Sequence, residues 1–268
     1  MFKIIGMTKL IWKLFKIVLT LLLAFLMYVV IGGVVPFLHH PDVSQTKKEA
    51  VESTQFYSDS VGPDRATIIE DNEEALKMRL RVIKDAQKTL ILSTFDFRSD
   101  DAGKDILAAL LNAADRGVKV EIFADGFNSI IQMENNDYFY ALSSNKNIKI
   151  IIYNQVNILI PWNGLGRMHD KYVIADDSLY ILGGRNTFGY FLGDYAGHKN
   201  YDRDVLVYNT GSKDSSIYQI KDYYKKITSQ KCCSVFHYNE SLGEKNSVKK
   251  AEQELKNRYE SLENKYDK

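Results

Sequence analysis

A histidine and a lysine stand two positions apart in this chain, at His169 and Lys171. Residues two apart on a β-strand point to the same face, so the sequence predicts that both side chains enter one pocket. A lysine ammonium binds an anionic oxygen as a point charge, and a neutral imidazole offers a nitrogen nucleophile. The lysine also lowers the proton affinity of its neighbour. The pair therefore indicates chemistry on an anionic substrate such as a phosphate ester.

Residues that follow this pair extend the candidate site. Gly183-Gly184 would let the backbone approach a ligand closely, and Asn186 can donate an amide hydrogen bond to a second phosphate oxygen. Lys171, Gly184 and Asn186 are thus the predicted phosphate-binding residues. Asp176 lies in a turn, and we expect it to complete the catalytic set with His169 and Lys171 as structural and electrostatic support. The competing interpretation makes His169 a surface histidine and the turn an ordinary one.

The elements that must position these residues alternate between strands and helices. Periodic apolar residues predict helices from Asp71 or Asn72, around Ile106–Ala114, and around Asp137–Leu142. Short apolar runs predict strands, and they lie at Thr89–Phe95, Val118–Phe123 and Ile148–Tyr153. Such alternation is typical of an α/β fold with a mostly parallel or mixed sheet flanked by helices.

A hairpin should carry the candidate site itself. Tyr172–Ala175 and Leu179–Leu182 read as two strands around the turn Asp176-Asp177-Ser178. A further strand at Asp204–Tyr208 precedes a helix from about Ser215 to Ile227. The charged tail after Gly243 has an apolar ridge typical of a helix that docks in part on the domain, with a partner-binding stripe as the alternative.

The N-terminal part of the chain has the composition of a membrane anchor. Residues 17–38 contain no charge, and 22 helical residues span roughly 33 Å, enough for a bilayer core. A cleaved signal peptide is the alternative, but its apolar region is usually only about 7–15 residues long. The lysines that precede the span predict a single pass through the cell membrane, with the N-terminus in the cytoplasm and the catalytic domain outside.

The predicted organisation has five parts. They are a basic cytoplasmic N-terminus at 1–16, a transmembrane anchor at 17–38, a tether at 39–62, a catalytic domain at 63–230 and a helical tail at 231–268. The formal net charge is +1, and the four lysines before residue 42 have no acid beside them, so the remainder carries −3. Polyanion binding normally needs a basic surface, so nucleic acid is an unlikely partner.

The spacing of His169, Lys171, Asp176, Gly183 and Asn186 resembles the H-x-K-x4-D-x6-G-(S/G)-x-N signature of the phospholipase D superfamily. Many members have serine where this chain has Gly184. The glycine pair makes the motif most similar to the first of the two motifs in bacterial cardiolipin synthases. Gly193-Asp194-Tyr195 and Arg203-Asp204 also resemble that subfamily. The resemblance extends over roughly Ala66 to Ile227, which corresponds to one catalytic half.

The resemblance implies a two-step phosphodiester exchange without a metal or other cofactor. One histidine attacks phosphorus and forms a phosphohistidine, and a second histidine from another copy of the motif protonates the leaving alcohol. Water or a lipid hydroxyl then takes the phosphoryl group. A carboxylate should hold His169 in one tautomer, and Asp204 is the candidate.

This chain carries a single copy of the motif, so its site should be incomplete alone. Either two chains pair as a homodimer, or a second motif-bearing half completes the site. The favoured function is a membrane-anchored phosphodiesterase or phosphatidyltransferase of phospholipase D type, with a phospholipid as substrate. A nuclease of the same superfamily and an inactive half that binds phosphoesters or partners are the alternatives.

Overall fold

The computed structural model describes residues 2–38, 42–49, 59–237 and 240–266. The chain divides into two compact units. The first comprises the described residues of 1–53 together with the loop 156–166, and the second comprises the described residues of 54–155 and 167–268. The second unit contains the predicted chemistry, and we call it the catalytic unit.

A single eight-stranded sheet forms the centre of the catalytic unit, in the order β1-β7-β6-β5-β2-β3-β4-β8. The strands are β1 (Asp64–Ile69), β2 (Thr89–Thr94), β3 (Lys119–Asp125), β4 (Ile148–Tyr153), β5 (Tyr172–Ala175), β6 (Leu179–Gly183), β7 (Asp204–Asn209) and β8 (Cys233–Val235). Strands β2, β3 and β4 pair in parallel, whereas the other neighbours pair antiparallel. The α/β class with a mixed sheet is confirmed, but parallel pairs are the minority, because β5, β6, β7 and β1 extend the sheet as antiparallel neighbours.

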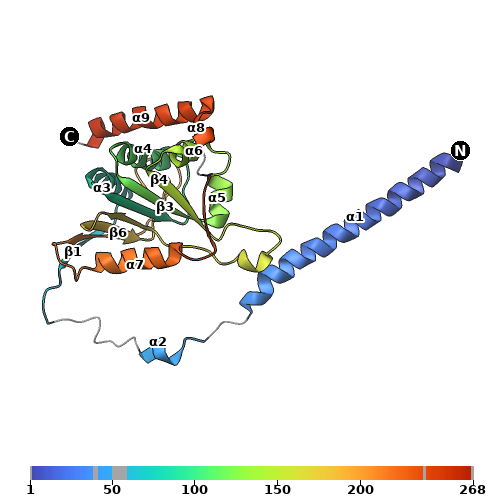
Figure 1. Ribbon diagram of the computed structural model, residues 1–268, viewed down its shortest axis with the longest axis horizontal. Coiled ribbons are helices and arrows are strands. Elements are labelled where there is room, and N and C mark those ends of the chain that lie inside the picture. The colour runs from blue at the N-terminus through green and yellow to red at the C-terminus, as the bar shows by residue number, and fades with distance from the viewer. Residues whose placement is uncertain (1, 39–41, 50–58, 238–239, 267–268) are drawn as a thin grey trace. The chain divides into compact units, whose positions relative to one another are not determined.

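Helices cover both faces of this sheet (Figure 1). The helices of the catalytic unit are α3 (Asn72–Asp85), α4 (Asp101–Asp115), α5 (Gly126–Gln132), α6 (Asp137–Ser144), α7 (Ser216–Thr228), α8 (Glu240–Gly243) and α9 (Asn246–Tyr266). Helices α3, α4 and α6 pack on one face and build the larger apolar core, which includes Leu76, Leu107 and Phe139. Helix α7 lies on the opposite face, where its Ile217 and Tyr224 join a smaller core.

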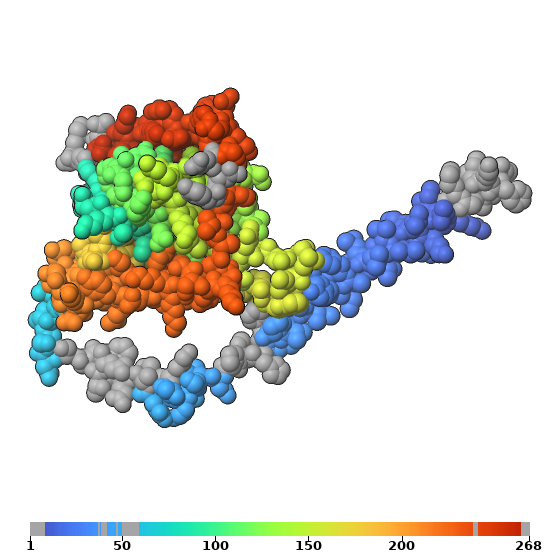
Figure 2. Space-filling view, in the orientation of Figure 1, coloured from blue at the N-terminus to red at the C-terminus, as the bar shows by residue number. Residues whose placement is uncertain are grey.

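The C-terminal helix α9 forms a further layer over α4 and α6, seen in red in Figures 1 and 2. Its predicted ridge faces inward: Leu255 is fully buried, and Ala251 and Leu262 are buried as well. Arg258 adds an ion pair with the buried carboxylate of Asp105 at 2.6 Å. The ridge is therefore part of the core, and the alternative of a free partner-binding stripe is wrong.

The first unit is built around α1 (Phe2–Val34), which a short 3₁₀ turn at Val35–Phe37 follows. By length and composition, Lys9–Val34 is the one helix among the described residues that could cross a membrane. Its mean hydropathy is 2.7 and none of it is buried. The predicted tether contains a short helix, α2 (Gln45–Glu49), and residues 39–41 and 50–58 of the tether lie outside the described residues.

Candidate active site

His169 and Lys171 lie directly before β5, where the chain enters the sheet. Strand β5 runs antiparallel to β2, with Tyr172 opposite Ser93. The two residues are therefore at the carboxyl end of β2, the edge where α/β sheets commonly bind ligands. The sequence predicted that both stand on the strand, but β5 begins only at Tyr172. The two side chains nevertheless meet in one place.

The two side chains are in direct contact. The ammonium of Lys171 lies 3.0 Å from Nδ1 of His169 and donates to the histidine backbone oxygen at 2.7 Å. Lys171 is only 4% exposed, whereas the imidazole reaches solvent. The ring of Phe95 packs edge-on against the imidazole, with 4.5 Å between the centroids. A buried cation thus supports an accessible imidazole whose ring plane is restrained.

The charges around this pair favour a neutral imidazole. Partial burial, followed by the positive charge of Lys171, lowers the pKa of His169 below its ordinary value, although the carboxylate of Asp170 opposes this shift. Burial likewise lowers the pKa of Lys171, against the opposing charges of Asp170 and Asp202. A neutral imidazole at mildly acidic pH is the form that a nitrogen nucleophile requires.

The carboxylate of Asp125, which the sequence interpretation missed, holds the segment that leads into the motif. It ends β3, is 1% exposed, and forms a bidentate ion pair with Arg167 at 2.6 and 2.9 Å. It also accepts from the backbone N–H of Met168 at 3.1 Å and caps the first turn of α5. Its position at the carboxyl end of a parallel strand was the signal that could have identified it.

The glycine pair makes room for two carboxylates. The hairpin places Gly183 beside Lys171, since the Gly183 N–H donates to the Lys171 oxygen at 3.1 Å. A side chain at Gly183 would collide with the carboxylate of Asp204, and one at Gly184 would collide with that of Asp202. Gly184 therefore brings Asp202, which the sequence interpretation also missed, close to the site.

The side chain of Asn186 already accepts a hydrogen bond in the structure. Its side-chain oxygen accepts from the backbone N–H of Asp96, which follows β2, at 3.2 Å. This contact leaves the amide N–H groups of Asn186 as the donors that could reach a phosphate oxygen. The contact also joins the residues after β6 to the end of β2, next to His169.

Asp176 lies beyond the opposite end of β5 from His169, in the β5–β6 turn, with a φ of 51°. Its carboxylate accepts hydrogen bonds from the backbone N–H groups of Gln87, Lys88 and Thr89, each at 2.8 Å. This arrangement fits the predicted structural support, because it ties the hairpin to the start of β2. It does not place Asp176 beside His169 and Lys171, which lie at the other end of β5.

Asp204 differs more strongly from its predicted role. It is 0% exposed, and its Oδ2 accepts from Arg79 at 2.9 Å and from Arg185 at 3.1 Å. Among the described residues, His169 is not a hydrogen-bond partner of this carboxylate. The structure therefore gives no support to Asp204 as the residue that orients His169. Two buried arginines attract the carboxylate more strongly than a neutral imidazole could.

A cavity of about 430 Å³ opens at the motif, between the start of β5 and α7. His169, Lys171 and Gly183 form one wall, and Gln219, Ile220 and Tyr223 of α7 form the other. Tyr223 donates to the carboxylate of Asp170 at 2.8 Å, so the wall is held in place. The described residues contain no group of three or more His, Cys, Asp or Glu that could hold a metal ion.

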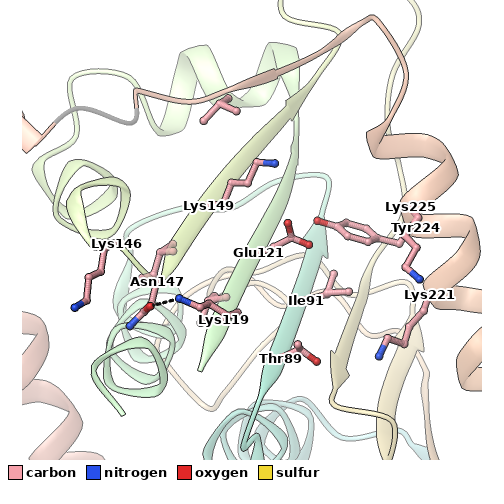
Figure 3. Close-up of a pocket in the computed structure, with 13 residues that line it drawn as sticks. Thr89, Ile91, Lys119, Glu121, Lys146, Asn147, Lys149, Lys221, Tyr224 and Lys225 are labelled. Atoms are coloured by element: carbon pink, nitrogen blue, oxygen red, sulfur yellow. Dashed lines mark hydrogen bonds between the residues drawn. The ribbon is translucent and has the colours of Figure 1, made fainter. Parts of the chain in front are cut away.

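A larger cavity of about 890 Å³ lies at the other end of the parallel strands and contains none of the predicted site residues. Figure 3 shows Glu121 projecting into it from β3, toward the ring of Tyr224 on α7. Lysines surround it, among them Lys119 and Lys149 from the sheet and Lys221 from α7. It is separate from the motif, which lines the smaller cavity.

Known proteins resemble this chain over about half of its length. Cardiolipin synthase B of Salmonella typhi is 32% identical over 142 residues, which are 52% of this chain and 34% of the relative. Cardiolipin synthase B of Escherichia coli (strain K12) is 30% identical over 146 residues, covering 54% and 35%. The chain thus spans about a third of the length of these relatives.

The fold has a counterpart among solved structures as well. NucT from Helicobacter pylori aligns with a TM-score of 0.50 at 21% identity, over 65% of this chain and 99% of that protein. At this identity the similarity concerns the fold. Residues 80–228, more than half of the chain, match the family described as "Cardiolipin synthase, PLD-like domain". The chain belongs to this family, and with it to the phospholipase D superfamily.

Proposed function

We propose that the chain is a membrane-anchored phosphodiesterase or phosphatidyltransferase that uses His169 as its nucleophile. The observation that carries this proposal is the contact between the buried ammonium of Lys171 and the accessible imidazole, at 3.0 Å. The ammonium neutralises an incoming phosphate and keeps the imidazole unprotonated. His169 forms a bond to phosphorus while the bond to the leaving alcohol breaks, which gives a phosphohistidine.

Substrate binding must first change the hydrogen bond between the two side chains. An ammonium that donates to Nδ1 leaves the proton of a neutral imidazole on Nε2. A phosphate oxygen is a stronger acceptor for Lys171 than the imidazole, because it carries charge. When the Lys171 ammonium donates to the phosphate instead of to the imidazole, or when the imidazole ring rotates, a nitrogen lone pair becomes free for attack. Asn186 donates to a second oxygen of the same phosphate.

The leaving alcohol needs a proton that His169 cannot supply while it forms the new bond. We assign this role to the His169 of a second chain, or to a second motif-bearing half. Water or the hydroxyl of another lipid then attacks the phosphohistidine. The same second histidine takes the proton of this acceptor, so hydrolysis and transfer share one mechanism.

We place the catalytic unit outside the cytoplasm, anchored by Lys9–Val34. The four lysines that precede the uncharged stretch 17–38 support this orientation. A cysteine introduced at Val43, with Cys232 and Cys233 changed to serine, should react with a membrane-impermeant maleimide in intact cells. Labelling that appears only after lysis would place the catalytic unit in the cytoplasm instead.

The substrate class is tested with the purified full-length chain in detergent micelles. We expect release of glycerol from phosphatidylglycerol, or formation of a diphosphatidyl product, and no such reaction with the His169→Asn variant. Single-stranded DNA is the parallel substrate, and preferential cleavage of DNA would establish the nuclease alternative. If the chain binds phosphoesters but turns over neither substrate, it is an inactive binding module.

A further inference from the structure

The loop at 156–166, which leads to the catalytic motif, has the chemistry of a membrane surface element rather than of a solvated loop. Its sequence, VNILIPWNGLG, contains no charged residue. Several of its apolar side chains are exposed in the structure; they are Ile158 at 56%, Leu159 at 66%, Trp162 at 45% and Leu165 at 53%. Large apolar side chains clustered at this density on a surface mark a contact with a partner or a lipid phase.

This loop packs on the end of α1 that lies farthest from the N-terminal lysines. Figure 2 shows it in yellow against the blue helix. The hydroxyl of Tyr28 donates to the backbone oxygen of Leu159 at 2.9 Å, and the rings of Tyr28 and Trp162 meet edge to face. Gly32 permits the approach, because a Cβ there would lie 2.6 Å from Cγ of Pro161. The loop is thus attached to the candidate membrane span itself.

The position of this contact along α1 corresponds to a membrane boundary. Tyr28 and Gly32 lie six and two residues before the end of the candidate span Lys9–Val34, which is about 9 and 3 Å along a helix. Tryptophan and tyrosine are enriched at both boundaries of membrane proteins. The contact of Pro161 and Trp162 with Gly32 and Tyr28 thus lies near the C-terminal end of the candidate span.

Internal hydrogen bonds make the backbone of the loop suited to a membrane boundary. Internal hydrogen bonds close successive turns, from Ile160 to Asn157, from Asn163 to Ile160 and from Gly166 to Asn163. The side chain of Asn157 also accepts from the N–H of Leu159 at 2.9 Å. Backbone groups that are already paired can approach hydrocarbon at lower cost. Part of the backbone beside the apolar side chains is therefore already paired when the loop meets lipid.

We propose that residues 156–166 insert into the interfacial region of a lipid bilayer at the outer end of α1, and that this contact gives the motif access to phosphodiesters at the bilayer surface. The inference rests on the proposed membrane anchor. His169 follows the last residue of the loop by three positions. A chain of three residues spans at most about 11 Å, so a loop held at the head-group level keeps the nucleophile near lipid phosphates.

The two tryptophans of the chain allow a direct test. Full-length Trp12→Phe keeps only Trp162, and Trp162→Phe keeps only Trp12. Each variant is reconstituted into phosphatidylcholine vesicles with acyl chains brominated at carbons 6 and 7 or at carbons 11 and 12. We expect both tryptophans to be quenched, and Trp162 to be quenched more strongly by the shallower bromines.

Two results would overturn the inference, and they differ from each other. Quenching of Trp12 without quenching of Trp162 leaves the anchor intact and places the loop in water. Absence of quenching in both variants overturns the anchor as well, and the proposed membrane function with it. Neither result depends on enzymatic activity.

A kinetic test uses the double variant Ile158→Ser/Leu159→Ser. Turnover of phosphatidylglycerol in vesicles should fall at least about tenfold, because two apolar side chains no longer stabilise the bilayer contact. Hydrolysis of water-soluble bis(4-nitrophenyl) phosphate should remain within about twofold of wild type, since neither residue lines the cavity at His169. Val61→Ser, a change at a side chain 84% exposed, serves as the matched control. Equal loss on both substrates would contradict the proposal.

Discussion

The Lys171 ammonium and the His169 imidazole affect each other's protonation through their contact at 3.0 Å. Burial and the positive charge of Lys171 both lower the pKa of His169. Removal of the charge stabilises the imidazolium, so the pKa of His169 should rise toward its ordinary value in Lys171→Met. In the wild-type chain, the acidic limb of the pH–rate profile should lie below pH 6.5, the ordinary value of the histidine pKa.

Histidine NMR titration measures this shift directly, and His169→Asn assigns the resonance. The resonance should titrate at higher pH in Lys171→Met than in wild type, and the acidic limb of any residual activity should move in the same direction. Lys213→Met, at an exposed lysine outside the cavity, is the control and should leave the titration unchanged. An unchanged His169 pKa in Lys171→Met would show that the contact does not control the charge state of the nucleophile.

The two-residue spacing of His169 and Lys171 correctly indicated that their side chains meet, because the two residues are close together in the sequence. The partner of Asp204 could not be read in the same way. Arg79 is 125 residues away from it in the sequence, and only the folded sheet brings the two together. Asp125 was missed for a related reason, since its bond to Arg167 joins the end of β3 to the segment before β5. Ion pairs between residues far apart in the sequence cannot be recognised from local sequence patterns.

At the scale of elements, the β5–β6 hairpin determines which residues surround the motif. Strand periods predicted the hairpin closely, with Tyr172–Ala175 and Leu179–Gly183 as its strands. The strand Ile148–Tyr153 was also predicted, and Asp71, one of the two expected starts of α3, is its capping residue. The three-residue strand β8 and the seven-residue helix α5 were not predicted.

The hairpin depends on Asp176, which accepts three backbone hydrogen bonds from the start of β2. Asp176→Ala loses these bonds and places alanine at a φ of 51°, so it should lower the free energy of unfolding by about 3 kcal/mol. Asp176→Asn keeps one acceptor oxygen and tolerates this φ, and it should lose about half as much. Urea unfolding followed by near-ultraviolet circular dichroism measures both.

Asp177→Ala provides a matched control in the same turn. Asp177 pairs with Lys221 at the surface, and such a pair contributes at most about 1 kcal/mol. A variant Asp176→Ala that unfolds like wild type but has lost turnover would contradict the structural role. It would return Asp176 to the residues that act on substrate.

At the scale of the whole molecule, the single motif requires a second histidine for a complete reaction. We expect that an excess of His169→Asn chains, coexpressed with wild type, forms dimers that contain one histidine. At a ninefold excess and random pairing, the activity per wild-type chain should fall to about a tenth. The control replaces the variant with differently tagged wild-type chains. Constant activity per wild-type chain at every ratio would rule out a homodimeric site.

The measurement that tests the central claim most directly is the identification of the covalent intermediate. Full-length chain is mixed with phosphatidylglycerol labelled at phosphorus, quenched in denaturant within one turnover and digested for mass spectrometry. The account predicts an acid-labile phosphatidyl adduct on His169 that is absent from His169→Asn, whose exposed side chain makes loss of the fold unexpected. An adduct on another residue, or near-normal turnover by His169→Asn, would contradict the account.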